Sequence, residues 1–140
     1  MSSSISVIGN LTSDPELKFT ESGKCVCTFT IADNHRVLNQ QTKEWENGTT
    51  SFYRVTCWEK LGENVAESLR KGQRAMVMGK LTIGNFEDAN GVTKTRVNLT
   101  ADSVGPELTF ATAIVQPVTK RAEVSQSVAN SYVPDYDEPF

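Results

Sequence analysis

Residues 52–58 alternate two kinds of side chain along a short stretch of the chain. One set is aromatic, basic or hydroxyl-bearing: Phe52, Arg54, Thr56 and Trp58. Alternate side chains of an extended strand share a face, so a strand here would carry this set on one side. Aromatic rings stack on bases, at about 1–3 kcal/mol per base, and cationic groups hold phosphates. The pattern therefore predicts a surface for single-stranded nucleic acid, with little preference for base sequence.

A second set of the same kind follows in residues 80–86. If Leu81 and Ile83 point inward, then Lys80, Thr82 and Phe86 share the outer side of a strand or its hairpin. Phe86 favours binding, because it has polar neighbours beside a predicted hairpin tip. Aromatic residues are also enriched at protein interfaces, so the pattern by itself leaves an oligomer interface open for both sets.

Other residues offer weaker chemistry. Cys25 and Cys27 share a predicted strand face with Phe29 and Ile31, so burial as small apolar groups is the better interpretation. A zinc site would need a second ligand pair at a suitable spacing, and the sequence has none. It also has no phosphate-binding loop, metalloprotease helix or nucleophile elbow, and its carboxylates form no convincing acid–base pair. We therefore expect no catalytic residue, no metal and no cofactor.

The charge balance at first argues against a nucleic-acid partner. Fourteen Lys and Arg residues stand against seventeen Asp and Glu residues, for a net charge of −3, whereas domains that bind nucleic acid usually carry a basic footprint. The excess of acid lies mainly at the end of the chain. Residues 1–110 hold twelve basic and thirteen acidic residues, net −1, and residues 111–140 hold two and four, net −2. The predicted binding body is therefore nearly neutral.

The elements that position these residues are mainly strands. Alternation of apolar and polar residues predicts five strands, around residues 5–11, 25–31, 53–57, 76–83 and 97–101. The polar residues 33–49 form a loop long enough for an extended hairpin arm. Asn90-Gly91 between two strands is a strong signal for a tight hairpin.

One helix interrupts this series of strands. Leu61, Val65 and Leu69 recur every four positions, with acid early, base late and Gly72 as the expected stop. Five strands with a helix between the third and fourth is the element order of an OB-fold, a small five-stranded barrel that binds oligonucleotides or oligosaccharides. The predicted fold class is all-β with one short helix, as an OB-fold barrel.

The 140 residues are room for about one domain. Residues 1–110 are predicted to form the OB-fold domain, and residues 119–140 a mostly disordered acidic tail. Residues 111–118 are apolar enough to form an extra strand that clasps a neighbouring subunit. No apolar run approaches the ~20 residues of a membrane helix, the start lacks a secretory signal, and the three cysteines are sparse and odd in number. These features predict a soluble, cytoplasmic protein without membrane contact.

The last six residues carry a separate signal: Asp135, Tyr136, Asp137, Glu138, Pro139 and Phe140. A solvating acidic tail is the usual interpretation of such a run. An aromatic residue at the free terminus favours another, because Phe140 with its α-carboxylate can fill an apolar pocket beside a basic residue. The acidic residues before it would steer it there. We therefore expect a tip that binds partner proteins.

Several stretches together resemble the bacterial single-stranded DNA-binding proteins. They are Val7-Ile8-Gly9-Asn10-Leu11 with Asp14-Pro15-Glu16, Phe52-Tyr53-Arg54-Val55, Trp58-Glu59-Lys60-Leu61, Glu67-Ser68-Leu69-Arg70-Lys71-Gly72, Val77-Met78-Gly79-Lys80-Leu81, and the acidic ending in Pro-Phe. The resemblance covers roughly residues 5–108. Phe52 and Phe86 stand where well-known members have tryptophan, and Glu138 replaces an apolar residue often found before Pro-Phe.

The resemblance implies an OB-fold that assembles as a homotetramer and binds single-stranded DNA in replication, recombination and repair, in the cytoplasm at the nucleoid. Phe52, Trp58 and Phe86 fall at base-stacking positions of the family. Arg54, Lys60, Arg70 and Lys71 fall at or near positions that contact the DNA backbone, and residues 135–140 would dock on DNA-processing proteins.

Two other classes of function stay open from the sequence. An OB domain can use its aromatic face for protein contacts, as an accessory module in replication restart. An OB-containing enzyme is a weaker alternative. RNA in place of DNA is also open, because stacking surfaces accept both and only contacts near the 2′-hydroxyl separate them.

Overall fold

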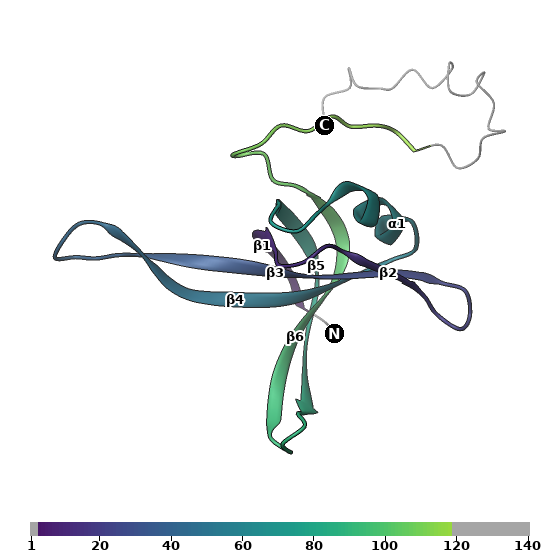
Figure 1. Cartoon of the computed structure of the whole chain (residues 1–140), viewed down its shortest axis with the longest axis horizontal. Helices are drawn as coiled ribbons and strands as arrows, with labels where there is room; N and C mark the ends of the chain where they lie inside the picture. The colour runs from purple at the N-terminus through teal and green to yellow at the C-terminus, as the bar shows by residue number, and fades with distance from the viewer. Residues whose placement is uncertain (1–2, 119–140) are drawn as a thin grey trace.

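The structure, a computed structural model, describes residues 3–118 of the chain (Figure 1). Its elements are β1 (Ser3–Leu11), β2 (Glu16–Phe19), β3 (Cys25–Leu38), β4 (Trp45–Trp58), α1 (Glu59–Ser68), β5 (Arg74–Glu87) and β6 (Thr93–Pro106). Within these residues no helix is long and apolar enough to span a bilayer.

Five of the strands close into a ring. The sheet has the order β1-β5-β6-β4-β3-β2, and β1 pairs a second time, with β3, through Asn10 opposite Ala32 and Leu11 opposite Ile31. That second pairing joins β1, at one end of the sheet, to β3 and leaves β2 outside the ring as the partner of β3 alone. With α1 between β4 and β5, this arrangement confirms the predicted OB-fold class.

β2 is the strand that was not predicted. Its residue types alternate polar and apolar over four positions, but all four residues are exposed in the structure. It is held by its ladder with β3, from Glu16 opposite Thr28 to Phe19 opposite Cys25. The strand therefore depends on a neighbouring strand rather than on a face of its own.

The core lies inside the ring and follows the predicted alternation. β3 contributes Cys27, Phe29 and Ile31, and β4 contributes Val55 and Cys57, all of them buried. Val65 of α1 and Leu69 just after it join the same cluster. The strands thus present every second residue to one shared interior, as half-buried strands do.

The helix is shorter at its end than predicted. It ends at Ser68, and Leu69 is already extended, with φ −113° and ψ 149°, as its side chain enters the core. Gly72 is not the stop; it lies farther on, with φ +86°. The last turn contains no basic residue, yet the Arg70 guanidinium donates to the carbonyl oxygens of Ala66 and Leu69. A cation therefore does meet the negative end of the helix, from outside it.

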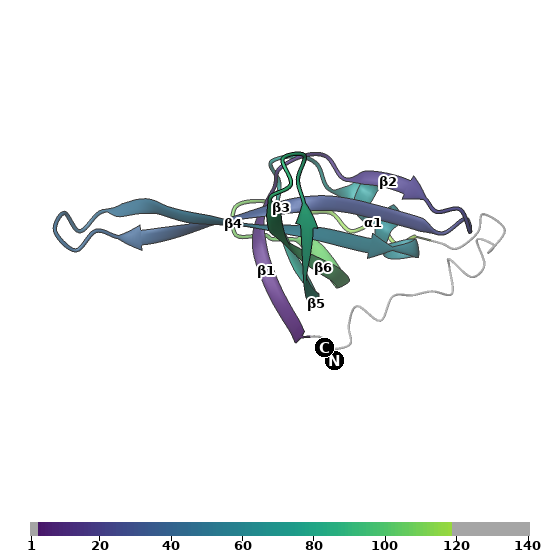
Figure 2. The same cartoon turned by 90° about the horizontal axis from the view of Figure 1, so that it is seen from below.

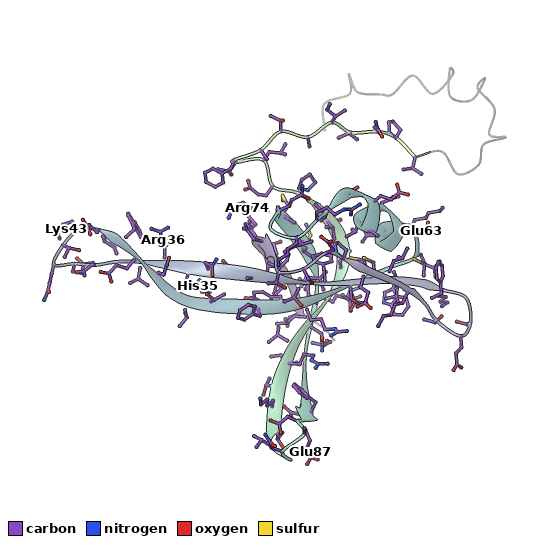
Figure 3. The ribbon with its side chains drawn as sticks, viewed as in Figure 1. His35, Arg36, Lys43, Glu63, Arg74 and Glu87 are labelled. Carbon is purple, nitrogen blue, oxygen red and sulfur yellow. The ribbon has the colours of Figure 1, made fainter. Side chains whose placement is uncertain are left out.

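Two hairpins extend beyond the ring in different directions (Figures 1 and 2). The first is the β3–β4 arm, whose ladder continues to Leu38 opposite Trp45, so the predicted polar loop is indeed an extended arm. Figure 3 shows His35, Arg36 and Lys43 along it. The second is the β5–β6 hairpin, which turns at Gly91 with φ +77° and confirms the hairpin predicted at Asn90-Gly91.

The chain leaves the ring at Pro106 and continues to residue 118 without a helix or strand. Its start is anchored to β5: the Arg74 side chain pairs with Glu107 at 2.6 Å, and the Glu107 N–H donates to the Arg74 carbonyl oxygen. Beyond this anchor, Phe110, Ile114 and Val115 are exposed. The predicted tail and its terminal tip, residues 119–140, lie outside the described residues.

Candidate nucleic-acid interface

The outer face of β4 presents the predicted set of side chains. Phe52 is 59% exposed and Trp58 is 44% exposed, and Arg54 between them is exposed as well. On the opposite face Val55 and Cys57 are fully buried. The one-residue alternation predicted for this strand is therefore confirmed along residues 52–58.

The neighbours of this face on β3 are small. Thr30 lies opposite Arg54, Ala32 opposite Phe52, and Thr28 opposite Thr56. Residues opposite each other in a ladder share a face of the sheet. Because the methyl group of Ala32 is short, it leaves the Phe52 ring open to solvent, as stacking on a base requires. Trp58 lies opposite Val26 and is still 44% exposed.

The same outer face continues across the sheet onto the β5–β6 hairpin. Arg54 is paired with Asn98 on β6, and Asn98 is paired with Thr82 on β5. Two residues before Asn98 on β6, Arg96 lies opposite Gly84, and two residues before Arg96, Lys94 lies opposite Phe86. Because side chains alternate between faces, all of these residues look outward on the side of Arg54. Phe86 therefore belongs to the same face as Phe52, on the other of the two hairpins.

Phe86 is in contact with a residue that was not predicted as part of the site. The guanidinium carbon of Arg96 lies 4.4 Å from the centre of the Phe86 ring, a cation–π geometry, and the ring is 37% exposed. Arg96 lies on the outer side of β6 with Asn98 and Thr100, since Leu99 between the last two is buried. The contact itself is diagonal across the hairpin, so it depends on a register that alternation does not supply.

The tip of this hairpin is well ordered by one carboxylate. Asp88 accepts hydrogen bonds from the N–H groups of Asn90 and Val92 and pairs with Lys94 at 3.3 Å. The backbone N–H of Val92 is the main cause that holds the pKa of Asp88 below its ordinary value. The backbone N–H of Asn90 and the side chain of Lys94 lower it further. The turn beside Phe86 is therefore fixed by local bonds.

One predicted orientation is wrong. Ile83 was expected to point inward with Leu81, yet it is 65% exposed, while Leu81 is half-buried. At Ile83 the β5–β6 hairpin has already left the ring, so neither of its faces has a core to cover. Ile83 is opposite Val97 and lies on the face away from Phe86.

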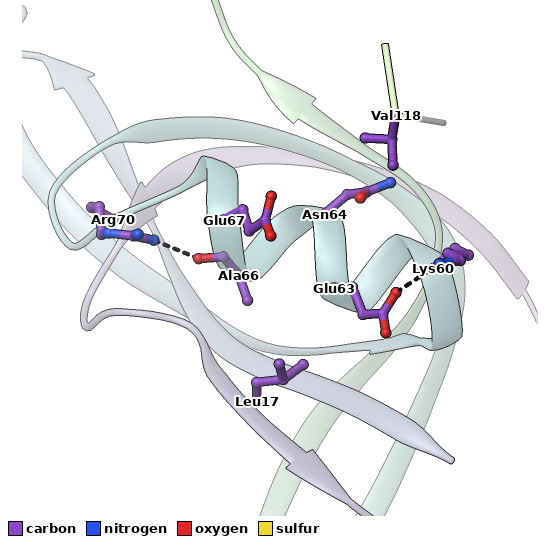
Figure 4. A pocket seen from close by; sticks show the side chains of 8 residues that line it. All are labelled: Leu17, Lys60, Glu63, Asn64, Ala66, Glu67, Arg70 and Val118. Carbon is purple, nitrogen blue, oxygen red and sulfur yellow. Dashed lines mark hydrogen bonds and ion pairs between the residues drawn. The ribbon is translucent and has the colours of Figure 1, made fainter. Parts of the chain in front are cut away.

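Of the other predicted basic residues, Lys80 lies on the same outer face, two strands away from β4: it is opposite Thr100, which pairs with Thr56 of β4. Its Nζ is 4.0 Å from a carboxylate oxygen of Asp102. Lys60 and Arg70 line a shallow groove along α1 that also contains Leu17 and Val118 (Figure 4).

Some of these basic residues already form bonds within the chain. Lys60 pairs with Glu63 at 3.2 Å, and Arg70 is engaged at the helix end. The backbone N–H of Lys71 donates to the carboxylate of Asp14 at 2.8 Å, a bond that does not engage its side-chain ammonium. Of the predicted bases, Arg54 alone lies on the β4 face itself.

A small polar hollow lies next to Arg54, between the β1–β2 connection and β3. It is lined by Ser13, Asp14, Glu16, Thr28, Phe29, Thr30 and Arg54. Two carboxylates beside the single arginine leave one negative charge in excess at this hollow. Any phosphate attraction here rests on few cations.

The cysteines are buried, as predicted. Cys27 lies opposite Cys57 in the β3–β4 ladder, and both thiols are free. Burial raises the pKa of Cys27 to about 11 and that of Cys57 to about 12, with a smaller contribution in each case from a neighbouring cysteine. His35 lies on the arm, with Nε2 3.0 Å from the Ser51 hydroxyl. No group of three or more metal-binding side chains comes together within residues 3–118.

A different surface, on the outer side of β1 and β5, is apolar. Ile8 lies opposite Met76, Met78 is opposite Ser6, and the three apolar side chains are exposed. Ala75 and Val77, which alternate with the two methionines, are buried in the core. The molecule thus exposes an aromatic and basic face on β4 and an aliphatic face on β1 and β5.

Comparison with known proteins gives relatives along most of the chain. A single-stranded DNA-binding protein of Paenarthrobacter aurescens is 49% identical over 111 residues, which are 79% of this chain and 65% of that protein. One of Mycobacterium tuberculosis strain H37Rv is 43% identical over 116 residues, 83% of this chain and 71% of the relative. The match thus spans about two thirds of the length of these relatives.

A solved structure shares the fold. The crystal structure of a small single-stranded DNA-binding protein from Streptomyces coelicolor superposes with a TM-score of 0.69 at 24% identity, over 76% of this chain and 95% of that one. The model of the single-strand binding protein family matches residues 2–106, which contain all of β1 to β6. The chain therefore belongs to the single-strand binding protein family.

Proposed function

We propose that this chain binds single-stranded DNA without catalysis and with little preference for sequence. The observation that carries the proposal is the outer face of β4, where Phe52, Arg54 and Trp58 are exposed on one side of a strand whose other side is core. Relatives at 43–49% identity are single-stranded DNA-binding proteins by name, which supports the same ligand here.

In this proposal the DNA strand runs over the β4 face and onto the β5–β6 hairpin. Phe52, Trp58 and Phe86 each stack on a base, and Arg54 holds a phosphate between them. Phe52 and Trp58 are six residues apart, roughly 20 Å along a strand, so they take separate bases. Stacking disregards base identity, and the nearly neutral surface makes stacking the larger part of the affinity.

We also propose backbone contacts for the remaining predicted bases: Lys60, Arg70, Lys71 and Lys80. Lys60 and Arg70 lie on the α1 groove, so a strand reaches them only after it leaves the β4 face. Their contributions would therefore appear with long oligonucleotides and be absent with short ones. A protein distinguishes DNA from RNA by contacts near the 2′-hydroxyl of the sugar. We propose DNA as the ligand because the relatives are single-stranded DNA-binding proteins by name.

Assembly as a homotetramer is the second part of the proposal. Its support is the exposed aliphatic surface of Ile8, Met76 and Met78 on the outer side of β1 and β5, because such a patch is more stable when a second copy covers it. Residues 111–118 add an extended segment with exposed Ile114 and Val115. We propose that this segment clasps a neighbouring subunit.

The third part concerns the terminal tip, residues 135–140. We propose that its Pro-Phe ending and the acidic residues before it recruit proteins of DNA replication, recombination and repair. The support is chemical: a terminal phenyl group with its carboxylate suits an apolar pocket beside a base, and acidic neighbours steer the approach. Deletion of these six residues should abolish partner capture and leave the affinity for DNA intact.

The DNA proposal is tested by a triple variant, Phe52→Ala/Trp58→Ala/Phe86→Ala, titrated into fluorescently labelled oligo-dT. We expect a loss of at least a hundredfold in affinity if each ring contributes in the range of about 1–3 kcal/mol. The matched control is Phe19→Ala/Phe110→Ala, which removes exposed rings away from this face. Equal affinity of the triple variant and the wild type would contradict the proposal.

The tetramer is tested by light scattering on the full chain. A mass near four times 15.4 kDa is expected, and Met76→Asp/Met78→Asp should lower it, since charges are costly in a covered apolar surface. A wild-type mass equal to one chain would contradict this part and leave the DNA proposal standing.

A further inference from the structure

The Phe86–Arg96 pair has features that a purely structural contact does not need. The guanidinium lies over the ring although the two residues are not direct partners in the ladder: Phe86 is opposite Lys94, and Arg96 is opposite Gly84. Because Gly84 has no side chain, nothing faces Arg96 from the partner strand, and it can lean along the diagonal onto the ring. The β5–β6 register thus holds a cation on an aromatic ring at an exposed position.

The charge of Arg96 is uncompensated. Among residues 3–118 it takes part in no ion pair. The molecule offers a direct contrast in Arg74, whose guanidinium carbon lies 5.7 Å from the centre of the Phe110 ring and whose Nε pairs with Glu107 at 2.6 Å. Arg74 has both a ring and a carboxylate, as a structural arginine does. Arg96 has the ring alone, so the in-plane N–H donors of its guanidinium remain for an anion.

The position of Arg96 identifies the anion. It lies on the same outward side as Asn98, which pairs with Arg54, and it is two residues nearer to Phe86. Any strand that connects a phosphate on Arg54 with a base on Phe86 passes this point. From these observations, and resting on the proposed function, we infer that Arg96 is a DNA-binding residue that holds the Phe86 ring from one face and binds the phosphate of the nucleotide stacked on the other.

This assignment has a consequence for the stoichiometry of stacking. A ring has two faces, and the guanidinium occupies one face of Phe86, so the residue stacks on a single base. The cation is also attracted electrostatically to the negative face of the ring. Arg96 therefore acts in two ways, through its charge on the phosphate and through its plane on the ring, and the two can be separated by substitution.

The experiment measures the affinity for labelled oligo-dT over a series of salt concentrations, with the full chain. Arg96→Gln removes the charge and is expected to lower affinity roughly fivefold to tenfold at low salt. It should also make the slope of log affinity against log salt shallower by about 0.7, the value for one phosphate contact on a single strand. Arg96→Lys keeps the charge and should keep the slope, with a smaller loss of affinity because an ammonium does not stack as a planar guanidinium does.

Arg74→Gln is the matched control, because it removes one positive charge from over a ring elsewhere; it should leave the slope unchanged. An Arg96→Gln variant with the wild-type slope would overturn the phosphate contact, and one with wild-type affinity would overturn the whole inference. Failure of the wild type to bind oligo-dT is a distinct result, which would overturn the proposed function instead. Urea unfolding of each variant verifies that it is folded, as expected at position 96, which is exposed.

Discussion

Neighbouring residues along β3 and β4 point to opposite faces of the sheet, and the two faces have different roles. The inner face holds Ile31, Val55 and Cys57, none of which is accessible to solvent. The outer face holds Phe52 and Trp58, whose rings are exposed although each could bury a large apolar area. An inward residue contributes to stability in proportion to the surface it removes from water. The exposed rings contribute less of that kind, and in the proposed function they stack on bases instead.

The largest expected effect separates the faces through stability. Ile31→Ala should lower the free energy of unfolding by about 2–5 kcal/mol, because it opens a cavity in the centre of the core. Urea denaturation measures this loss. Thr30→Ala, one residue away on the outer face, should change stability by less than about 0.5 kcal/mol. Similar losses for the two variants would break the distinction between the faces.

The second effect separates them through binding. Phe52→Ala should weaken oligo-dT binding by about 1–3 kcal/mol, the range for one stacked base, while its unfolding free energy stays near that of the wild type. Anisotropy of a labelled oligonucleotide, with urea denaturation in parallel, gives both values. A large loss of stability without loss of affinity would instead assign Phe52 a structural role.

The third effect is a pH dependence of the unfolding free energy that comes from the buried thiols of the inner face. Burial raises the pKa of Cys27 to about 11 and of Cys57 to about 12, while an unfolded cysteine keeps its ordinary value near 9.0. Below pH 9 both states hold their protons; above it the unfolded chain ionises first, so stability should fall as pH rises from 9 towards 12. The loss is about 1 kcal/mol per thiol at pH 10.

Urea unfolding at pH 8 and pH 10 measures that loss. The Cys57→Ala variant is the control, and its stability should depend less steeply on pH over this interval than that of the wild type. Equal pH dependence of the two proteins would show that the Cys57 thiol ionises as readily in the folded state as in the unfolded one.

The smallest effect concerns charge on the outer face. Arg54→Gln should make the salt dependence of binding shallower by about 0.7 in the slope of log affinity against log salt, for the loss of one phosphate contact. Lys24→Gln, on the turn between β2 and β3, serves as a control for the loss of one positive charge. A slope equal to that of the wild type would remove Arg54 from the set of phosphate contacts.

Alternation predicted the parts of the fold in which one face of a strand meets the core. It predicted the sides of Phe52 and Val55 correctly because the ring encloses that part of β4. It misplaced Ile83 because β5 continues past the core. It overlooked β2, whose residue types alternate polar and apolar over only four positions and which has no buried face in the structure. Sequence periodicity reports burial, so elements held by backbone ladders alone escape it.

The candidate site shows the same limit. Phe52, Arg54 and Trp58 could be grouped from spacing, since they share one strand. The inclusion of Phe86 depends on the pairing of Arg54 with Asn98 and of Asn98 with Thr82, which joins residues far apart in sequence. Arg70 could be selected by its charge, but its hydrogen bonds to the end of α1 follow from where the helix stops, and that point was predicted wrongly.

The most direct test of the central claim uses the fluorescence of Trp58. The chain has two tryptophans, so Trp45→Phe leaves Trp58 as the sole reporter, on the β4 face. Titration of this variant with oligo-dT at low salt should quench the emission strongly and saturate at a fixed number of nucleotides per subunit, because the indole stacks on a base. Unchanged emission of the folded protein under the same conditions would contradict the claim that the outer face of β4 is where the DNA strand binds.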